Sequence, residues 1–186
     1  ICTTGYRTAK PHVVVVTFPD GHIETFDFSP KGGQGDYWLA YARFTARPGT
    51  SSTLAAVGDD NLLDQGDGNL YDEGSGEPYN PTQFLLTTHD GSKLLLDTTV
   101  GLQSFTNLAG ITYTFSSTGI SSSAGGNTAV FTRDSAGRIT DIKADGHTSY
   151  TYSAAGDLAS VTDPAGAVTT FDYDGQHDLL KVTGPG

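Results

Sequence analysis

The sequence predicts an all-β fold in which meandering antiparallel hairpin repeats form a curved sheet. Thr, Tyr, Phe and Val, which favour strands, are frequent, and 24 Gly and 8 Pro supply turns. Apolar residues alternate with a period of two, which suits strands that are half buried on one face. From about residue 94 a unit of 18 to 21 residues repeats, and such a unit is too short for two helices of ordinary length.

Length and charge exclude several classes of protein. The 186 residues fit one large domain or two small ones. Lys and Arg number 10 against 21 Asp and Glu, a formal charge of −11, which argues against a protein that binds nucleic-acid phosphates through clustered cations. The longest apolar run, Val13 to Val16, is too short to span a membrane.

The single cysteine, Cys2, cannot form a disulfide within the chain. A buried or terminal thiol, an interchain disulfide and lipid attachment remain open for it. The sequence contains no Met, which favours a processed or excised piece of a longer product.

The first 83 residues are expected to form an N-terminal β-rich segment, either a separate domain or the start of the same sheet. Within this segment, Val13–Phe18 and Ile23–Phe28 flank Pro19-Asp20-Gly21. Asp and Gly tolerate the positive φ of a tight primed turn, so these residues predict a hairpin.

The following stretch is less regular. Lys31–Gly35 predicts a loop, and Asp36–Phe44 predicts a strand. Residues 58–81 predict an acidic, Gly-rich loop. This loop is either solvated or holds a structural Ca²⁺, because Ca²⁺ prefers several oxygen ligands on a flexible loop. No other cofactor is expected.

Aromatic residues are densest in the predicted strand Asp36–Phe44. Alternation places Trp38 on one face of this strand and Tyr37 and Tyr41 on the other. These side chains form either core or, if the rings are exposed, a platform on which sugars stack.

Residues 84–186 are expected to hold degenerate and then clear repeats. Phe84–Thr88 and Lys93–Leu96 form a hairpin around His89-Asp90-Gly91. Later units are anchored by a Gly, or its replacement, shortly before an apolar residue. The anchors are Gly101, Gly119, Gly137, Gly156 and His177, and the closing strands are residues 112–115, 129–132, 149–152 and 170–173. One sheet face would be apolar and would need a partner surface.

The segment Phe131–Pro185 closely resembles the RHS/YD-repeat family. Tyr173-Asp174 is the dipeptide that gives the repeat its name, and GDLASVTDPAG, from Gly156 to Gly166, matches the middle of the family pattern. Upstream copies drift from it, since Tyr152 is followed by Ser153. An Asp after Tyr is expected to cap a turn by accepting a backbone hydrogen bond two residues on.

This resemblance implies a strip of spiralling β-sheet which in full-length relatives closes into a hollow shell. In bacterial polymorphic toxins and in the C component of insecticidal toxin complexes, the shell encloses a C-terminal toxic domain. Wall-associated proteins and the animal teneurins carry the repeat in large surface or secreted proteins. Many members have a self-cleaving carboxylate site, but no segment of this sequence matches it.

The sequence offers no catalytic or cofactor-binding residue. It has no metal-ligand spacing of Cys and His and no phosphate-binding Gly motif. Gly74-Ser75-Gly76 lacks the strand-to-helix elbow that exposes a nucleophile. The histidines are interpreted as turn residues rather than acid-base groups, and they are His12, His22, His89, His147 and His177.

The leading hypothesis is a non-enzymatic, secreted or cell-surface structural module that encloses or presents a C-terminal effector. Its partners would be further repeats and a C-terminal domain of its own polypeptide, with no nucleic acid and no membrane span. One alternative is a carbohydrate-binding or adhesion surface. Another is a fibre or surface layer that assembles when neighbouring copies pair through unpaired sheet edges.

Overall fold

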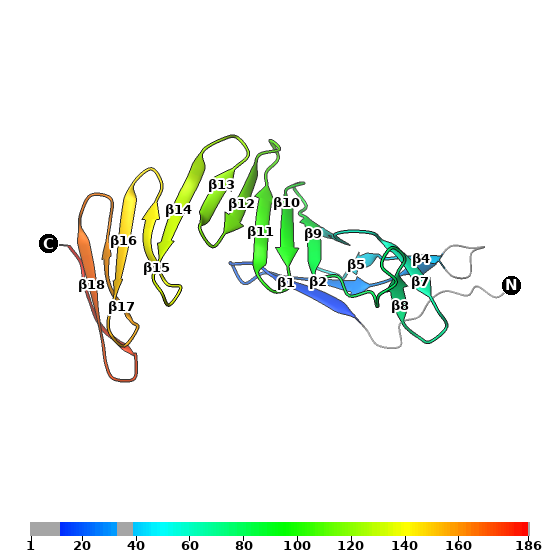
Figure 1. Cartoon of the computed structure of the whole chain (residues 1–186), viewed down its shortest axis with the longest axis horizontal. Coiled ribbons are helices and arrows are strands. Elements are labelled where there is room, and N and C mark those ends of the chain that lie inside the picture. Colours follow the sequence, from blue (N-terminus) through cyan, green and yellow to red (C-terminus); the bar gives the residue numbers. More distant parts are fainter. Residues whose placement is uncertain (1–11, 33–38, 186) are drawn as a thin grey trace. The chain divides into compact units, whose positions relative to one another are not determined.

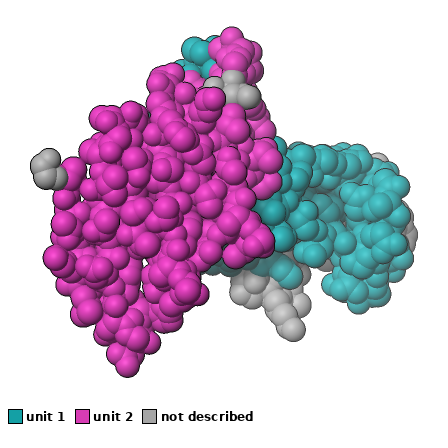
Figure 2. Space-filling model, turned by 60° about the vertical axis from the view of Figure 1, so that its left-hand side comes forward, with its two compact units in different colours: residues 1–111 teal, residues 112–186 magenta. Residues whose placement is uncertain are grey.

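The computed structural model describes residues 12–32 and 39–185 (Figure 1). These residues form strands, turns and loops without a helix, and the strands pair in antiparallel fashion. The all-β prediction with antiparallel hairpins is therefore confirmed. The chain divides into two compact units, residues 1–111 and 112–186 (Figure 2). The predicted division after residue 83 remains a prediction.

The first unit contains three groups of paired strands. The order β1-β2-β5 joins Val13–Thr17, Ile23–Phe28 and Phe44–Ala46. The order β3-β4-β7-β8 joins Lys31–Gly32, Leu39–Tyr41, Asn61–Asp64 and Leu70–Asp72. The order β6-β9-β10-β11 joins Thr53–Ala56, Gln83–Thr87, Lys93–Asp97 and Gly101–Thr106.

The second unit contains strands β12 to β19, which pair in the order of the sequence. They are Thr112–Ser116, Gly119–Ser122, Asn127–Arg133, Ile139–Lys143, His147–Tyr152, Leu158–Thr162, Val168–Tyr173 and Leu179–Thr183. Each predicted closing strand lies within one of them. The predicted meander is therefore confirmed for the repeats.

The hairpin predicted around Pro19-Asp20-Gly21 is confirmed, but its predicted turn type is wrong. Gly21 N donates to Phe18 O at 2.9 Å, and Gly21 has a φ of 84°. Asp20 does not have a positive φ; instead its carboxylate accepts a hydrogen bond from His22 N at 2.9 Å. The turn is therefore a three-residue loop with a left-handed Gly rather than a two-residue primed turn.

The single strand predicted for residues 36–44 is wrong in the part that the structure describes. Strand β4 ends at Tyr41 and β5 begins at Phe44, and these strands lie in different sheets. Ala42 N donates to Asp60 O on one side, and Ser29 N donates to Arg43 O on the other. The chain thus changes its partner strand at Ala42–Arg43. The predicted loop was also wrong at Lys31–Gly32, which form β3, while residues 33–38 lie outside the described part.

The acidic segment 58–81 is not a simple loop, because it contains the hairpin β7–β8. Leu62 in β7 is fully buried and packs with Ala40 and Ala42, so apolar contacts hold this hairpin in place. A charge-based prediction missed it because Asp and Gly outnumber the apolar residues of the segment.

The two units differ in their core. In the first unit, Phe26, Leu54, Phe84 and Leu86 form a buried cluster. Among the described residues of the second unit, only Gly119 is buried. The second unit by itself is thus one layer of strands whose apolar side chains stay partly or fully exposed.

The loop type seen at Gly21 also connects the repeats. At residues 163–167, Asp163 N donates to Ala167 O, Gly166 N donates to Asp163 O, and Oδ1 of Asp163 accepts from Ala165 N and Ala167 N at 2.9 and 2.8 Å. Loops with the same backbone bonds occupy residues 88–92, 107–111, 134–138, 153–157 and 174–178.

The last of these loops tests two predictions made from the sequence. Oδ1 of Asp174, which follows Tyr173, accepts from Gln176 N and Asp178 N, so the predicted turn cap is confirmed. His177 has a φ of 68° and is the only described residue other than Gly with a positive φ. It therefore replaces the turn Gly, as predicted.

Replacing Gly166 with Ala should lower the free energy of unfolding of the repeat segment by about 1–2 kcal/mol, because an L-residue in the left-handed region costs that much. Gly166 has a φ of 84°, and a Cβ there would meet nothing within 4 Å, so strain alone acts. Urea unfolding followed by circular dichroism measures the change.

Gly175→Ala is the matched control, because Gly175 also has open space and its φ lies outside the left-handed region. The control should shift the unfolding free energy by about 0.5 kcal/mol or less. Equal losses in both variants would contradict the assigned turn.

Candidate functional site

The candidate functional site is the apolar face of the repeat sheet, and a β-bulge determines which residues lie on it. In the pair β16–β17, Tyr150 is opposite Val161 and Tyr152 is opposite Leu158, with Ala159 as the extra residue. Leu158 and Val161 therefore share a face although they are three residues apart. The strict period of two that the sequence suggested is wrong here, because the bulge resets the alternation.

The same bulge recurs in other strand pairs. The register shifts between Leu95 and Leu96 in β10–β11, between Thr132 and Arg133 in β14–β15, and between Asp172 and Tyr173 in β18–β19. In each case two apolar residues with two residues between them are brought to one face. These residues are Leu102 with Phe105, Ile139 with Ile142, and Leu179 with Val182.

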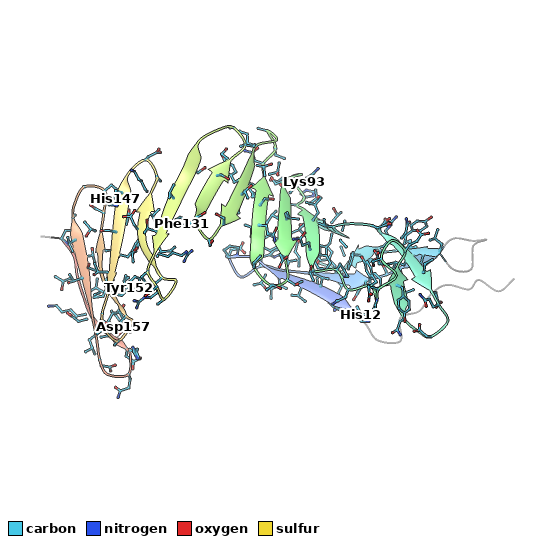
Figure 3. The ribbon with its side chains drawn as sticks, viewed as in Figure 1. His12, Lys93, Phe131, His147, Tyr152 and Asp157 are labelled. Carbon is cyan, nitrogen blue, oxygen red and sulfur yellow. The ribbon has the colours of Figure 1, made fainter. Side chains whose placement is uncertain are left out.

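The apolar face of the second unit is built from cross-strand pairs. Phe131 lies opposite Ile142, Tyr150 opposite Val161, and Phe171 opposite Val182. The burial pattern of β18 alternates strictly, with Thr169, Phe171 and Tyr173 half-buried and the residues between them exposed. Phe131 and Tyr152 are labelled in Figure 3. The predicted separation of apolar residues from Thr, Ser and Asp holds only in part, because Thr169 lies on this face and Val168 on the exposed one.

Arg138 links two consecutive repeats at the turns. Its Nε donates to Asp134 at 2.8 Å, and its Nη1 donates to Gly156 O at 3.3 Å. The guanidinium lies 4.4 Å from the ring centre of Tyr152, whose hydroxyl donates to Ile139 O at 2.7 Å. The hydrogen bond from Arg138 holds the pKa of Asp134 below its usual value. Tyr152 therefore has a structural role, since it contacts Arg138 and bonds the backbone of β15.

A second link between repeats joins Asp157 to His177, which sequence analysis treated as a turn residue. His177 Nδ1 lies 2.7 Å from Asp157 Oδ1 of the preceding repeat. His147 Nε2 contacts Asp141 Oδ2 within one hairpin, β15–β16, so that pair does not link repeats. Ser153 Oγ also bonds Asp157, at 3.4 Å, so the Ser and the His both bond the carboxylate. A Ser-His-Asp triad needs the His between the other two groups, so this set does not form one.

Glu24 is a buried carboxylate that sequence analysis missed. The residue is 1% exposed, and its Oε1 accepts hydrogen bonds from Ser51 N and Oγ, both at 3.1 Å. His22 Nε2 lies 3.5 Å from the same oxygen, and within the described residues Oε2 is buried without a partner. Burial alone would raise the pKa of Glu24, but the hydrogen bonds to its carboxylate, including the two from Ser51, outweigh it and lower the pKa.

The sequence did contain a signal for Glu24. In the strand Ile23-Glu24-Thr25-Phe26, alternation places Glu24 on the same face as Phe26, which is fully buried. Because the carboxylate fastens the segment at Ser51 to β2, the structure gives it a positioning role in the first unit.

Two carboxylates of the acidic segment 58–81 accept hydrogen bonds from residues close to them in sequence. Asp67 accepts hydrogen bonds from Tyr71 Oη at 2.5 Å and from Asn69, which together lower its pKa to about 2. Asp72 accepts from Ser75 N and Oγ at 2.7 and 2.8 Å. Across residues 12–32 and 39–185, no three His, Cys, Asp or Glu side chains gather as metal ligands would. Ca²⁺ binding by this segment remains a prediction.

The predicted aromatic cluster lies only partly within the described residues. Tyr37 and Trp38 are outside them. Phe44 packs against Phe28 and Phe84, with ring centres 5.5 Å apart in both pairs, so this aromatic residue belongs to the core.

Comparison with known families identifies one segment. Residues 152–186 match the family model of the RHS repeat. The match supports membership of the RHS/YD-repeat family, and it covers the loops and bulges described for β17 to β19. No curated protein matches the chain. The described residues include no helix of the length and apolarity needed to cross a membrane.

Replacing Glu24 with Gln should destabilise the first unit at pH 7 by about 1–3 kcal/mol, because the Ser51 hydrogen bonds then go to a neutral amide oxygen and the buried NH2 group takes the place of an oxygen that has no partner. The pKa of Glu24 lies below 4.5, so its ionic contribution is present above pH 4.5 and is lost as the pH falls through the lowered pKa. The deficit of the variant should therefore shrink on acidification.

Urea unfolding of both proteins between pH 7 and pH 3 measures this dependence. Glu77→Gln is the control, since Glu77 is exposed on the same unit and should give no comparable deficit. A deficit for Glu24→Gln that is constant with pH would show that lost packing, rather than charge, is responsible.

Proposed function

Because residues 152–186 match the RHS repeat, we propose that the chain is a non-enzymatic, extracellular structural module. Its repeats enclose or present a C-terminal effector of the same polypeptide. Its partners are then further repeats and that C-terminal domain. The mechanism is containment, in which backbone hydrogen bonds make a wall and one face of the wall contacts the enclosed polypeptide.

The observation that carries this proposal is the sorting of side chains by the repeated bulge. It brings both apolar residues of the repeat, such as Leu158 and Val161, to one face, while Thr151 and Thr170 on the other face are exposed. The apolar face of the second unit is covered by nothing within that unit. A face of this kind needs a partner surface, and an enclosed polypeptide supplies one.

The matched family agrees with a structural role. The RHS repeat is a structural repeat, and RHS repeats typically occur in secreted or cell-surface proteins. Arg138 and Asp157 both bond groups of the following repeat, which supports a continuous wall rather than independent hairpins.

The exposed strand β19 favours a second candidate function, which is self-assembly into a fibre or layer. All five of its residues are exposed, and Leu179, Leu180 and Val182 are each more than half exposed. In the described structure β19 pairs only with β18, so its outer edge is open to another strand.

No described feature of the structure specifically supports the carbohydrate-binding alternative. It depended on Trp38, which lies outside the described residues, and on exposed repeat tyrosines, whereas Tyr152 is engaged by Ile139 and Arg138. It remains a prediction.

Containment is tested on the full-length product of the gene by limited proteolysis. The region that follows residue 186 should resist trypsin while it is joined to the repeats. Replacing Tyr150 and Phe171 with Asp should make that region at least about tenfold more sensitive, because charged groups on the apolar face disfavour its contact with the enclosed chain.

Thr151→Asp with Thr170→Asp is the matched control, since these residues occupy the same strands but the opposite face. The control should leave protection unchanged, and circular dichroism checks that both variants fold. Equal digestion in the wild type and the apolar-face variant would refute containment.

Self-assembly is tested by sedimentation of the 186-residue chain over a wide concentration range. Assembly through β19 predicts species larger than the 19.5 kDa monomer. Val182→Pro should shift them to monomer, because a Pro on an edge strand blocks the approach of another strand. A stable wild-type monomer at high concentration would exclude this candidate.

A further inference from the structure

A cavity of about 930 Å³ opens in the first unit beside the beginning of β1. Residues His12 to Val15 line one side, and His12 is labelled in Figure 3. Phe28, Phe44 and Phe84 add aromatic walls. Its volume is near the upper end for sites that take small organic ligands or short peptides, about 300–1,000 Å³.

The cavity reaches both the inner face and the edge of β1. The half-buried Val14 lines it together with the exposed Val13 and Val15, whose side chains point to the opposite side of the strand, so the cavity extends around the edge of β1. Val13 and Val15 are 38% and 57% exposed.

The register of β1 with β2 determines which backbone groups of β1 point to this edge. Phe28 N donates to His12 O, and Phe18 N donates to His22 O, so both of these opposed pairs are hydrogen-bonded pairs. Since such pairs alternate along an antiparallel ladder, Val14 also bonds β2, while Val13, Val15 and Thr17 direct their N–H and C=O groups away from β2. Within the described chain, β1 pairs with no other strand.

One wall of the cavity carries negative charge, because the carboxylate of Asp64 lies in the lining together with Gly68 and Asn69. Asp67 is next to Gly68 but is not itself a lining residue, and hydrogen bonds from Tyr71 and Asn69 lower its pKa to about 2. A ligand with cationic side chains at this wall is therefore favoured.

We propose that this cleft binds an extended peptide that pairs with the free edge of β1 and places Lys or Arg beside the acidic wall. The backbone donors and acceptors of Val13 and Val15 repeat at the spacing of a strand, so they match another strand better than a compact small molecule. The inward side chains of the peptide would lie against the aromatic walls. This site is separate from the apolar face of the repeats.

The probe is a fluorescein-labelled peptide of about seven residues, with Lys at both ends and alternating Thr and Val between them, which in extended form is long enough to span β1. Fluorescence anisotropy with the 186-residue chain should show saturable binding. The peptide is also prepared in two N-methylated forms, each blocking one alternate set of amides. Only the form that blocks the amides facing β1 should lose binding.

Val15→Pro removes an N–H that points away from β2, so it leaves the β1–β2 ladder intact, and Pro is tolerated on such an edge. It should weaken binding about tenfold or more, because a peptide carbonyl loses its donor. Val15→Thr keeps the N–H and should bind within about twofold of the wild type. If circular dichroism shows that Val15→Pro does not fold, the two N-methylated peptides still test the proposal on the wild-type chain.

Three results would overturn the proposal. The first is a failure of the binding test. The wild type shows no saturable binding, the two N-methylated peptides bind equally, or folded Val15→Pro binds the peptide as tightly as the wild type does. The second is self-association of the chain that Val15→Pro abolishes, since the occupant is then a second copy. The third is binding that appears only after residues 1–11 are removed, since the chain then fills its own cleft.

Discussion

The three-residue loop, whose last residue is left-handed, is the constraint on which the second unit depends; with the pair that closes it, the loop forms a five-residue segment. It fixes the number of residues between two strands and so fixes their register. At Asp163 and Asp174 the carboxylate accepts two backbone N–H groups that would otherwise point into an open turn. At the fourth position of this segment stands Gly166 in one loop and His177 in the other. Only when the register is fixed can the bulge that follows bring Leu158 and Val161 to one face.

The two units differ in how much of their apolar surface they bury. The first unit closes a core around Phe26 and Leu86, and the buried Glu24 fastens the segment at Ser51 to it. The described part of the second unit buries no apolar side chain, so its order comes from backbone pairing and from links such as Arg138 to Gly156 O. A single layer of this kind gains stability when its apolar face is covered.

Much of the repeat could be predicted from sequence because its signals are local. The turn residues act within five positions, so Asp174 and His177 were correctly interpreted without knowledge of the rest of the chain. The bulge at Ala159 could not be predicted, since it is a property of two paired strands. The hairpin β7–β8 was missed because Leu62 is held by contacts with Ala40 and Ala42, which are distant in sequence. The break after Tyr41 likewise follows from a change of partner strand.

The order of strands β12 to β19 has a kinetic consequence. After β12, each strand of this unit pairs with the strand before it in sequence, so every contact closes only a short loop and the unit has low contact order. Such a segment can assemble while the chain is still being synthesised, with each finished hairpin serving as the template for the next strand. In the reverse direction, pulling on the chain near β19 would unzip the strands one at a time, because the stability of the array is a sum of nearest-neighbour contributions.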